Sequence, residues 1–285
     1  MLLFSLLVSL SFSLGHLIAQ DIPPAALMTL RFALASLVML GVARAFGVAI
    51  GPAFQQFWRF LLIGGCMAVY FITMFEALRL TTPVSTAAVF TLTPLLAAGF
   101  GYVLLSQRTS AATFAALSIG ACGAIWVIFR ADFAALMRFG IGPGEAIFTL
   151  GALAHGAVPS LSRKLLADVS PLQAALGTTV GALIVAGLYG LRDLIAVPYA
   201  ELPGLVWIVL LYLAIVTTAV TFFLMQFASK RLPGSKVMAY TYLVPSWVVM
   251  WELLFHGARP ATAILFGIAG TVLALILLLR DEEIG

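Results

Sequence analysis

The chain has 285 residues, of which 63% are hydrophobic and only 9% are charged, with a mean hydropathy of +1.14. Water-soluble domains carry about 45–50% apolar and about 25% charged residues, so this composition excludes a soluble globular protein. The net charge is +4, but the basic residues stand singly or in pairs between apolar runs. That arrangement argues against a nucleic-acid partner and is typical of the loops of a membrane protein.

Apolar runs of membrane-spanning length follow one another along the whole chain. A spanning helix needs about 20 mostly apolar residues, whereas the strands of a membrane barrel alternate apolar and polar residues, which these runs do not. Charged residues and turn sequences such as Pro23-Pro24 and Thr82-Pro83 separate the runs. We therefore predict an all-α membrane protein with about ten transmembrane helices. The predicted spans cover residues 2–20, 25–43, 59–78, 84–105, 109–129, 143–163, 171–190, 204–228, 237–255 and 260–279.

The lysines and arginines between the spans predict the orientation, because short cytoplasmic loops are enriched in them. With the N-terminus inside, nine of these residues lie on the cytoplasmic side and five on the opposite side. We therefore expect both termini in the cytoplasm. The cytoplasmic set is Arg44, Arg59, Arg108, Arg163, Lys164, Lys230, Arg231, Lys236 and Arg280, and the opposite set is Arg79, Arg130, Arg138, Arg192 and Arg259.

The two halves of the chain match each other at a nearly constant offset. A shift of 151 residues places Pro94 on Pro245, and a shift of 147 residues places Asp21 on Asp168. Such coincidences of proline and charge are uncommon in so apolar a chain, and they indicate an internal repeat. The same shifts pair Arg108 with Arg259, Ser13 with Ser160 and Pro24 with Pro171.

Each half contains an odd number of predicted spans, so matched helices run in opposite directions through the membrane. Inverted repeats of this kind are common in secondary transporters, which bind substrate near the bilayer midplane between the halves. We predict a 5+5 inverted-repeat bundle. Its first five-helix repeat covers residues 1–130, a connecting loop covers 131–142, and the second, inverted repeat covers 143–285.

Short motifs in both halves are similar to those of a known family. Leu30-Arg31-Phe32 follows the two prolines at 23 and 24, residues 91–95 read Thr-Leu-Thr-Pro-Leu, and residues 242–245 read Tyr-Leu-Val-Pro. In this order they resemble the drug/metabolite transporter (DMT) superfamily, EamA-like family. That family often has Gly-Glu-Arg after the proline of the fourth helix, where this chain has Ser106-Gln107-Arg108. The resemblance implies export of amino acids or related metabolites through the inner (plasma) membrane.

Five ionisable side chains fall in the outer half of the predicted membrane region. Ionisable residues inside a membrane are rare and costly, so each is a candidate functional residue. One interpretation is a polar gate near the outer mouth, in which Arg31 binds a substrate carboxylate or pairs with Glu76. The other is that charges near helix ends anchor the helices at the interface. The five residues are Arg31, Glu76, Glu252, His16 and Glu145.

His155 is predicted near the membrane midplane, about twelve residues into its span. It is either a cavity residue or a structural histidine that is hydrogen-bonded to a neighbouring helix. Pro94, Pro159 and Pro245 lie inside predicted spans, where each removes a backbone hydrogen bond and kinks its helix. These kinks shape a cavity or a rocking motion on one interpretation, and serve packing alone on the other.

Aromatic residues of the third and ninth spans are candidates to wall a cavity for an amphipathic or aromatic solute. They are Tyr70 on the third span, with Tyr240, Tyr242 and Trp247 around the proline of the ninth. Gln226, deep in the eighth span, is a candidate hydrogen-bonding contact. Each of the aromatic side chains is also compatible with an ordinary place in an interface belt or a lipid-facing surface.

The sequence contains no HExxH, GxSxG, paired His/Cys or P-loop pattern, so we expect neither an enzyme nor a bound metal or cofactor. The preferred hypothesis is a secondary transporter that works by alternating access. Its expected partners are a small-molecule metabolite and membrane lipids, with protons as a candidate coupling ion at Glu76, Glu252 and His155. The alternative is a lipid-handling or channel-like membrane protein. Substrate identity, transport direction and the choice between monomer and homodimer stay open.

Overall fold

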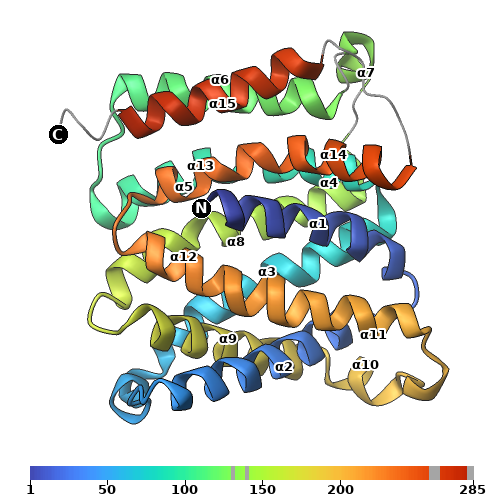
Figure 1. Cartoon of the computed structure of the whole chain (residues 1–285), viewed down its shortest axis with the longest axis vertical. Helices are drawn as coiled ribbons and strands as arrows, with labels where there is room; N and C mark the ends of the chain where they lie inside the picture. The colour runs from blue at the N-terminus through green and yellow to red at the C-terminus, as the bar shows by residue number, and fades with distance from the viewer. Residues whose placement is uncertain (130–131, 139–140, 257–263, 281–285) are drawn as a thin grey trace.

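A computed structural model of the protein describes residues 1–129, 132–138, 141–256 and 264–280. Every regular element in this part of the chain is a helix. The long helices run side by side, and their connections gather at two ends of the bundle (Figure 1). The prediction of an all-α membrane protein is therefore confirmed. We call the end that holds the connections 46–57, 106–110, 166–170 and 230–233 the basic end, and the other the far end.

The first half of the described chain crosses the bundle five times. Helix starts follow from local sequence: Pro24 opens its helix because the N–H that proline lacks would be unpaired there, and the Ser110 hydroxyl caps another by accepting from the backbone N–H of Thr113 at 3.0 Å. The crossings are α1 (Leu2–Ile18), α2 (Pro24–Ala45), α3 (Trp58–Leu80), α4 (Pro83–Phe90) with α5 (Thr93–Leu105), and α6 (Ala111–Ile128), with the short helix η1 (Gly51–Gln56) before α3.

The second half of the described chain also crosses five times, and its third and fourth crossings are composite. The crossings are α8 (Pro143–Leu165), α9 (Pro171–Tyr189), α11 (Gly204–Leu211) with η3 (Tyr212–Val220) and α12 (Thr221–Ser229), α13 (Gly234–Ala239) with η4 (Tyr240–Leu243) and α14 (Val244–His256), and α15 (Ile264–Arg280). The connections hold α7 (Phe133–Met137), α10 (Leu191–Ala196) and η2 (Tyr199–Glu201).

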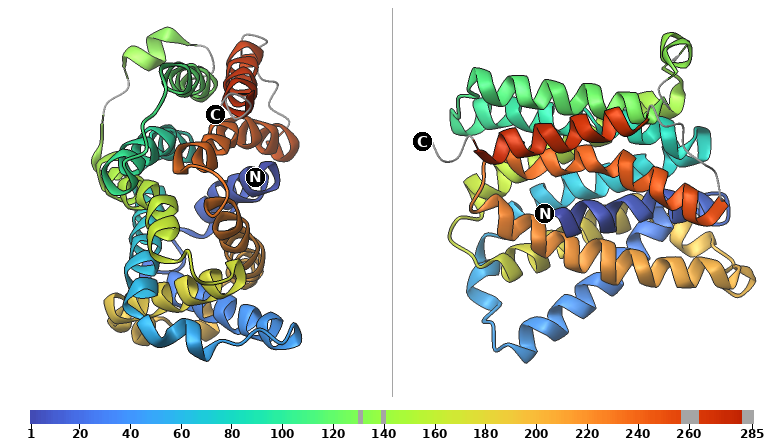
Figure 2. Two further views of the ribbon diagram at one scale, coloured as in Figure 1. Left: turned by 90° about the vertical axis from the view of Figure 1, so that its left-hand side faces the viewer. Right: turned by 45° about the horizontal axis from the view of Figure 1, so that its top comes forward.

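The two halves interlock rather than standing apart. Helix α3 of the first half packs against α8 and α9 of the second, α2 packs against α9, and α1 packs against α14. Helices α6 and α15, which end the two halves, lie against each other along one edge of the bundle (Figure 2). Residues buried between the halves are therefore the ones that a relative movement of the halves would rearrange.

The outer surface of the bundle is as apolar as the membrane interior. Leu188, Ile195 and Phe266 are each more than 70% exposed, because lipid rather than water surrounds them. Within the described residues, five helical spans reach at least 18 residues and are apolar enough to cross a membrane, and α1, α6 and α15 contain shorter apolar helices. Length and composition thus agree with a multi-pass membrane protein.

Pro94 and Pro245 lie where the regular α-helix of a crossing is interrupted. Pro94 follows the short turn between α4 and α5, and Pro245 follows the 3-10 segment η4 that joins α13 to α14, so each proline lies in the first turn of the next helix. A first turn tolerates proline because its N–H groups have no partner within the helix, so the chain breaks the helix before the ring instead of straining it. Pro159 does lie inside a helix, α8, as expected.

Candidate functional site

A cluster of stacked rings lies where the two halves meet. His155 of α8 stacks on Tyr70 of α3, with ring centres 4.2 Å apart and an interplanar angle of 24°. Phe90, the last residue of α4, lies 5.4 Å from His155 and 5.7 Å from Tyr70, and Phe148 of α8 lies 5.8 Å from Tyr70. All four side chains are buried. We call these four residues the central cluster, and it joins three helices from both halves.

His155 brings an unpaired polar atom into the central cluster. Its side chain is 2% exposed, and its Nδ1 has no hydrogen-bond partner among the described residues. A buried polar group without a partner costs about 1–3 kcal/mol. The structure thus shows no hydrogen bond from this Nδ1 to a neighbouring helix, and the role of His155 as a cavity residue stays a prediction.

Arg31 is completely buried on α2 and holds that helix against the irregular segment η3. Its Nε donates to the Thr218 hydroxyl at 2.6 Å, and its Nη2 donates to the hydroxyl and carbonyl oxygens of Thr217 at 3.1 Å each. Its guanidinium carbon lies 3.8 Å from the centre of the Phe71 ring, a cation–π distance. Segment η3 is a π-helix, a rare form that is frequent at functional sites.

The suggested pair between Arg31 and Glu76 is wrong. Glu76 pairs instead with Arg79, one turn along the same helix, at 3.3 Å, and both side chains are more than a third exposed. In contrast, Arg31 faces hydroxyl, carbonyl and aromatic groups, and no carboxylate of the described chain contacts it. The sequence places both residues in the outer half of the predicted membrane region. In the structure, Arg31 is buried inside the bundle, whereas Glu76 is partly exposed.

The other predicted residues of the polar gate have separate structural partners. Glu145 is 6% exposed and caps α8, because it accepts from the Thr81 hydroxyl at 2.5 Å and from the Gly142 N–H at 3.0 Å. His16 is exposed, and its Nδ1 lies 3.2 Å from the carbonyl oxygen of Leu78. The side chain of Glu252 lies outside the described residues. The four described side chains, Arg31, Glu76, Glu145 and His16, therefore do not form one cluster.

The aromatic residues of the ninth crossing lie apart from the central cluster. Tyr242 is buried against α6, with its hydroxyl unpaired, and Trp247 donates to the Ser5 hydroxyl of α1 at 3.1 Å. Tyr240 packs against the same apolar group as Trp247. Gln226 is buried near α9, where its amide donates to the Thr178 hydroxyl at 3.3 Å and its carbonyl oxygen has no described partner.

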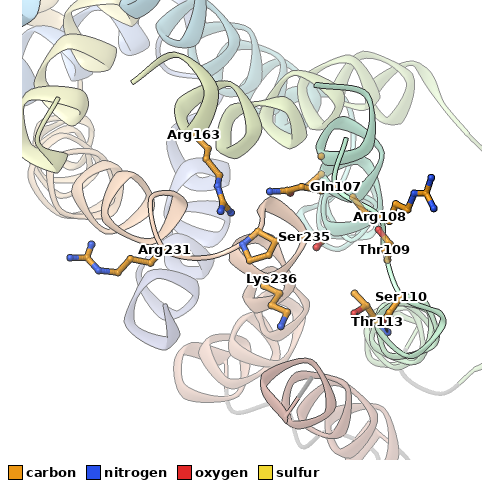
Figure 3. A pocket seen from close by; sticks show the side chains of 13 residues that line it. Gln107, Arg108, Thr109, Ser110, Thr113, Arg163, Arg231, Ser235 and Lys236 are labelled. Atoms are coloured by element: carbon orange, nitrogen blue, oxygen red, sulfur yellow. Dashed lines mark hydrogen bonds between the residues drawn. The ribbon is translucent and has the colours of Figure 1, made fainter. Parts of the chain in front are cut away.

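A hollow of about 340 Å³ opens at the basic end between α5, α8 and α13. We call it the basic pocket, and Figure 3 shows its side chains. This pocket was not predicted from the sequence, because its arginines were used only to predict the membrane orientation. One signal was present, namely the replacement of glutamate by Gln107 in the family-like motif. Its polar lining includes Gln107, Arg108, Arg163, Arg231, Ser235 and Lys236.

A second hollow is an apolar groove of about 680 Å³ between α2, η3 and α12. Val38, Val42, Phe223 and Phe227 line it, and Arg231 lies at its rim. Such a groove is the feature that a lipid-handling protein would use. Arg231, however, donates to the Phe227 carbonyl at 3.1 Å and covers the Phe227 ring at 3.7 Å, so this cation is already engaged.

Comparisons with known proteins agree with this architecture. A curated relative, "Uncharacterized transporter YyaM" of Bacillus subtilis (strain 168), is 25% identical over 283 residues, which is 96% of this chain and 89% of that protein. A solved crystal structure that is 22% identical covers 96% of this chain and 94% of its own, with a TM-score of 0.75, and shows the same fold. The repeat boundaries at residues 130 and 143 stay a prediction. The model of the EamA-like transporter family matches residues 1–129 and 142–280, so this membrane transporter belongs to that family.

Proposed function

We propose that this transporter is a secondary carrier that exports a small organic metabolite, an amino acid or a related solute, across the inner membrane by alternating access. The observation that carries the proposal is the stack of His155 on Tyr70 at 4.2 Å, with the Nδ1 of His155 buried and unpaired. The two side chains come from different halves, so a solute between them would contact both halves at once. Closure of one half on the other would then depend on the solute.

The chemistry of the central cluster suits a solute with both apolar and polar parts. The rings of Tyr70, Phe90 and Phe148 offer flat apolar faces, and His155 offers a hydrogen bond. The break between α4 and α5 follows Phe90 directly, so this ring lies at a joint of the fourth crossing. A change at that joint would move one wall of the site.

Arg31 is proposed as part of a gate rather than as a direct ligand. Its donors hold η3 to α2 through Thr217 and Thr218, and that contact joins the two halves beside the Phe71 ring. Release of the guanidinium would let η3 move relative to α2. Substitution of Arg31 should therefore alter the rate of transport more than the choice of solute.

The test is counterflow in proteoliposomes with a panel of amino acids and related metabolites. We expect accelerated uptake of at least one solute by the wild type, loss of that uptake in His155→Ala, and reduced uptake in Arg31→Ala. Leu188→Ala, a change at a 76% exposed lipid-facing residue, is the matched control. Wild-type uptake in a folded His155→Ala protein would overturn the proposed site.

The same vesicles test coupling and the lipid-handling alternative. A pH gradient across the membrane should drive uptake if protons are coupled, and His155→Ala should abolish that drive. Reconstitution with a fluorescent phospholipid measures lipid movement between leaflets. Fast lipid movement without any solute counterflow would favour the apolar groove over the central cluster as the functional site.

The orientation follows the positive-inside rule and is tested by cysteine labelling. Thr109 lies at the basic end and Arg138 at the far end. In whole cells, an impermeant thiol reagent should label Arg138→Cys and leave Thr109→Cys unlabelled until the membrane is permeabilised. Both background cysteines, Cys66 and Cys122, are first replaced by alanine, because they are free thiols.

A further inference from the structure

The described residues that line the basic pocket carry positive charge and include no carboxylate. Four cationic side chains line it. It lies where α5, the end of α8 and the start of α13 converge, and thus between the two halves of the protein. A half-enclosed hollow with one sign of charge attracts ions of the opposite sign.

The three arginines of the pocket differ in what they contact. Arg231 is bound to the carbonyl and ring of Phe227 and points away from the hollow, and Arg108 also points away (Figure 3). Arg163 points into the pocket, and the Gln107 amide points toward it from the opposite wall (Figure 3). Within the described residues, Arg163 makes no hydrogen bond or ion pair, although it is half-buried. A half-buried guanidinium in this state calls for an anion.

We propose that the basic pocket binds the carboxylate or phosphate group of a small organic anion, with Arg163 as the principal ligand. The planar guanidinium donates two parallel hydrogen bonds to such a group. The Gln107 amide and the Ser235 hydroxyl, both in the pocket wall, supply uncharged donors beside it. The rest of the solute then occupies the remainder of the 340 Å³ hollow.

The pocket is connected to the central cluster along a single helix. Arg163 and His155 are both on α8, eight residues and about 12 Å apart along its axis. Between them lies Ser160, whose buried Oγ has no described partner. A Cβ atom added to Gly234 would lie 3.2 Å from this Oγ. Gly101 of α5 does line the pocket, and a Cβ atom on it would lie 3.9 Å from the Ser160 Oγ, so only small groups separate the pocket from this hydroxyl.

This inference rests on the proposed function only where it makes the bound anion the transported solute. The anion site itself is a separate claim that binding measurements decide. The positive-inside rule alone would also place basic residues at this end. It does not, however, predict that anion binding depends on one arginine more than on its neighbours. Lys164 is the natural comparison, because it is the next residue on α8, is exposed and does not line the pocket.

The experiment measures binding of inorganic phosphate, succinate and glutamate to the purified full-length protein in an uncharged detergent, by calorimetry at constant ionic strength with chloride as the balancing anion. We expect at least one probe to bind the wild type. Arg163→Gln should weaken this binding by about tenfold or more, since it removes a charge-assisted bidentate contact. Gln107→Glu should abolish it, because the new carboxylate would pair with Arg163. Lys164→Gln should leave it unchanged.

A second arm identifies the source of the anion. In nanodiscs of phosphatidylglycerol, a lipid headgroup that fills the pocket would displace the soluble probe, whereas nanodiscs of phosphatidylcholine would leave its binding intact. If phosphatidylglycerol displaces the probe from the Arg163 site, the natural ligand is a lipid phosphate. If the probe still binds in phosphatidylglycerol, the natural ligand is a soluble anion. Either result supports the anion site.

Two results would overturn the anion site: no binding of any probe to the wild type, or equal weakening by Lys164→Gln and Arg163→Gln. Thermal unfolding of each variant shows whether it is folded, and Gln107→Glu, in a half-exposed connection, provides a second variant if Arg163→Gln is unstable. If no anion binding is found but counterflow is intact, the transport proposal stands. If the protein binds the anion but shows no counterflow, the anion site is supported and the transport proposal is wrong.

Discussion

Helices α1 and α8 open the two repeats and occupy matched positions, since a shift of 147 residues places Ser13 of α1 on Ser160 of α8. Both hydroxyls are buried and have no described partner, so the match extends to an unusual polar feature. The packing around the two helices nevertheless differs. Around α8 the neighbouring backbones come close, because glycines face them. Around α1 the neighbours reach it with long aromatic side chains.

The contacts of α8 leave no room for a side chain. A Cβ atom on Gly156 would lie 2.9 Å from the Cβ of Leu96, and one on Gly151 would lie 3.2 Å from the carbonyl oxygen of Tyr70. Helices that approach this closely gain dispersion contacts along their backbones. The seam between α8 and the first half is therefore closely packed in this state of the protein.

The contacts of α1 are hydrogen bonds at the tips of large side chains. Trp247 donates to the Ser5 hydroxyl at 3.1 Å, Trp251 donates to Ser9 at 2.9 Å, and the Tyr212 hydroxyl donates to the Leu7 carbonyl at 2.9 Å. Such contacts tolerate a shift of the helix better than interlocked backbones do, because the side chains can change rotamer. The comparison suggests that α1 moves first when the halves rearrange.

The largest effect should come from breaking the α8 seam with Gly156→Leu. The added side chain would press on the Cβ of Leu96 and on the backbone of Ala97, so we expect a loss of about 1–3 kcal/mol or more in the free energy of unfolding. Thermal unfolding in detergent measures it. Gly99→Leu on α5, where a Cβ meets nothing within 4 Å, should unfold like the wild type. Equal stability of the two variants would mean that the seam is not tightly closed.

The next effect separates the function of α8 from its packing. His155→Phe keeps a ring against Tyr70 but removes the unpaired nitrogen, whose burial costs about 1–3 kcal/mol. We expect the unfolding free energy to stay equal or to rise by about 1 kcal/mol while counterflow is lost. That combination is typical of a residue retained for activity at some cost in stability. A folded variant that transports at the wild-type rate would contradict it.

A smaller effect tests the hydrogen bonds that hold α1. Trp247→Phe removes the donor to Ser5, and a typical net loss is about 0.5–1.5 kcal/mol. A double-mutant cycle with Ser5→Ala should show that the two changes are coupled, because either one deletes the same bond. Trp58→Phe, at a 57% exposed position, is the control and should show no coupling to Ser5→Ala. Additive losses for Trp247 and Ser5 would show that the bond contributes nothing.

The sequence predicted the helical class and most breaks between crossings, because hydropathy and proline act locally. It placed both Arg31 and Glu76 in the outer half of the membrane, because depth follows from residue count. It could not show that their side chains have different neighbours, because the direction of a side chain depends on how its helix is rotated in the bundle. The stack of His155 on Tyr70 was missed for the same reason. The role of Arg163 was missed because loop charge alone does not show where a hollow forms.

The smallest effect compares the loops that follow the two helices. After α8, Asp168 accepts from both Nη atoms of Arg59, at 2.7 and 3.2 Å, whereas the matched Asp21 after α1 makes no described side-chain contact. The hydrogen bonds from Arg59 hold the pKa of Asp168 below its usual value. Its side chain is 61% exposed, so we expect the pair to contribute only a few tenths of a kcal/mol.

The pH dependence gives that contribution a definite sign. An aspartate whose pKa is lowered by folding stabilises the folded state above the unfolded-state value of about 3.9, and this stabilisation is lost as the pH falls through the lower folded-state value. The difference in unfolding temperature between the wild type and Asp168→Asn should therefore be present at neutral pH and vanish in acid. Asp21→Asn should match the wild type throughout. A difference that grows toward acid pH, or an equal difference for Asp21→Asn, would contradict the contrast between the two loops.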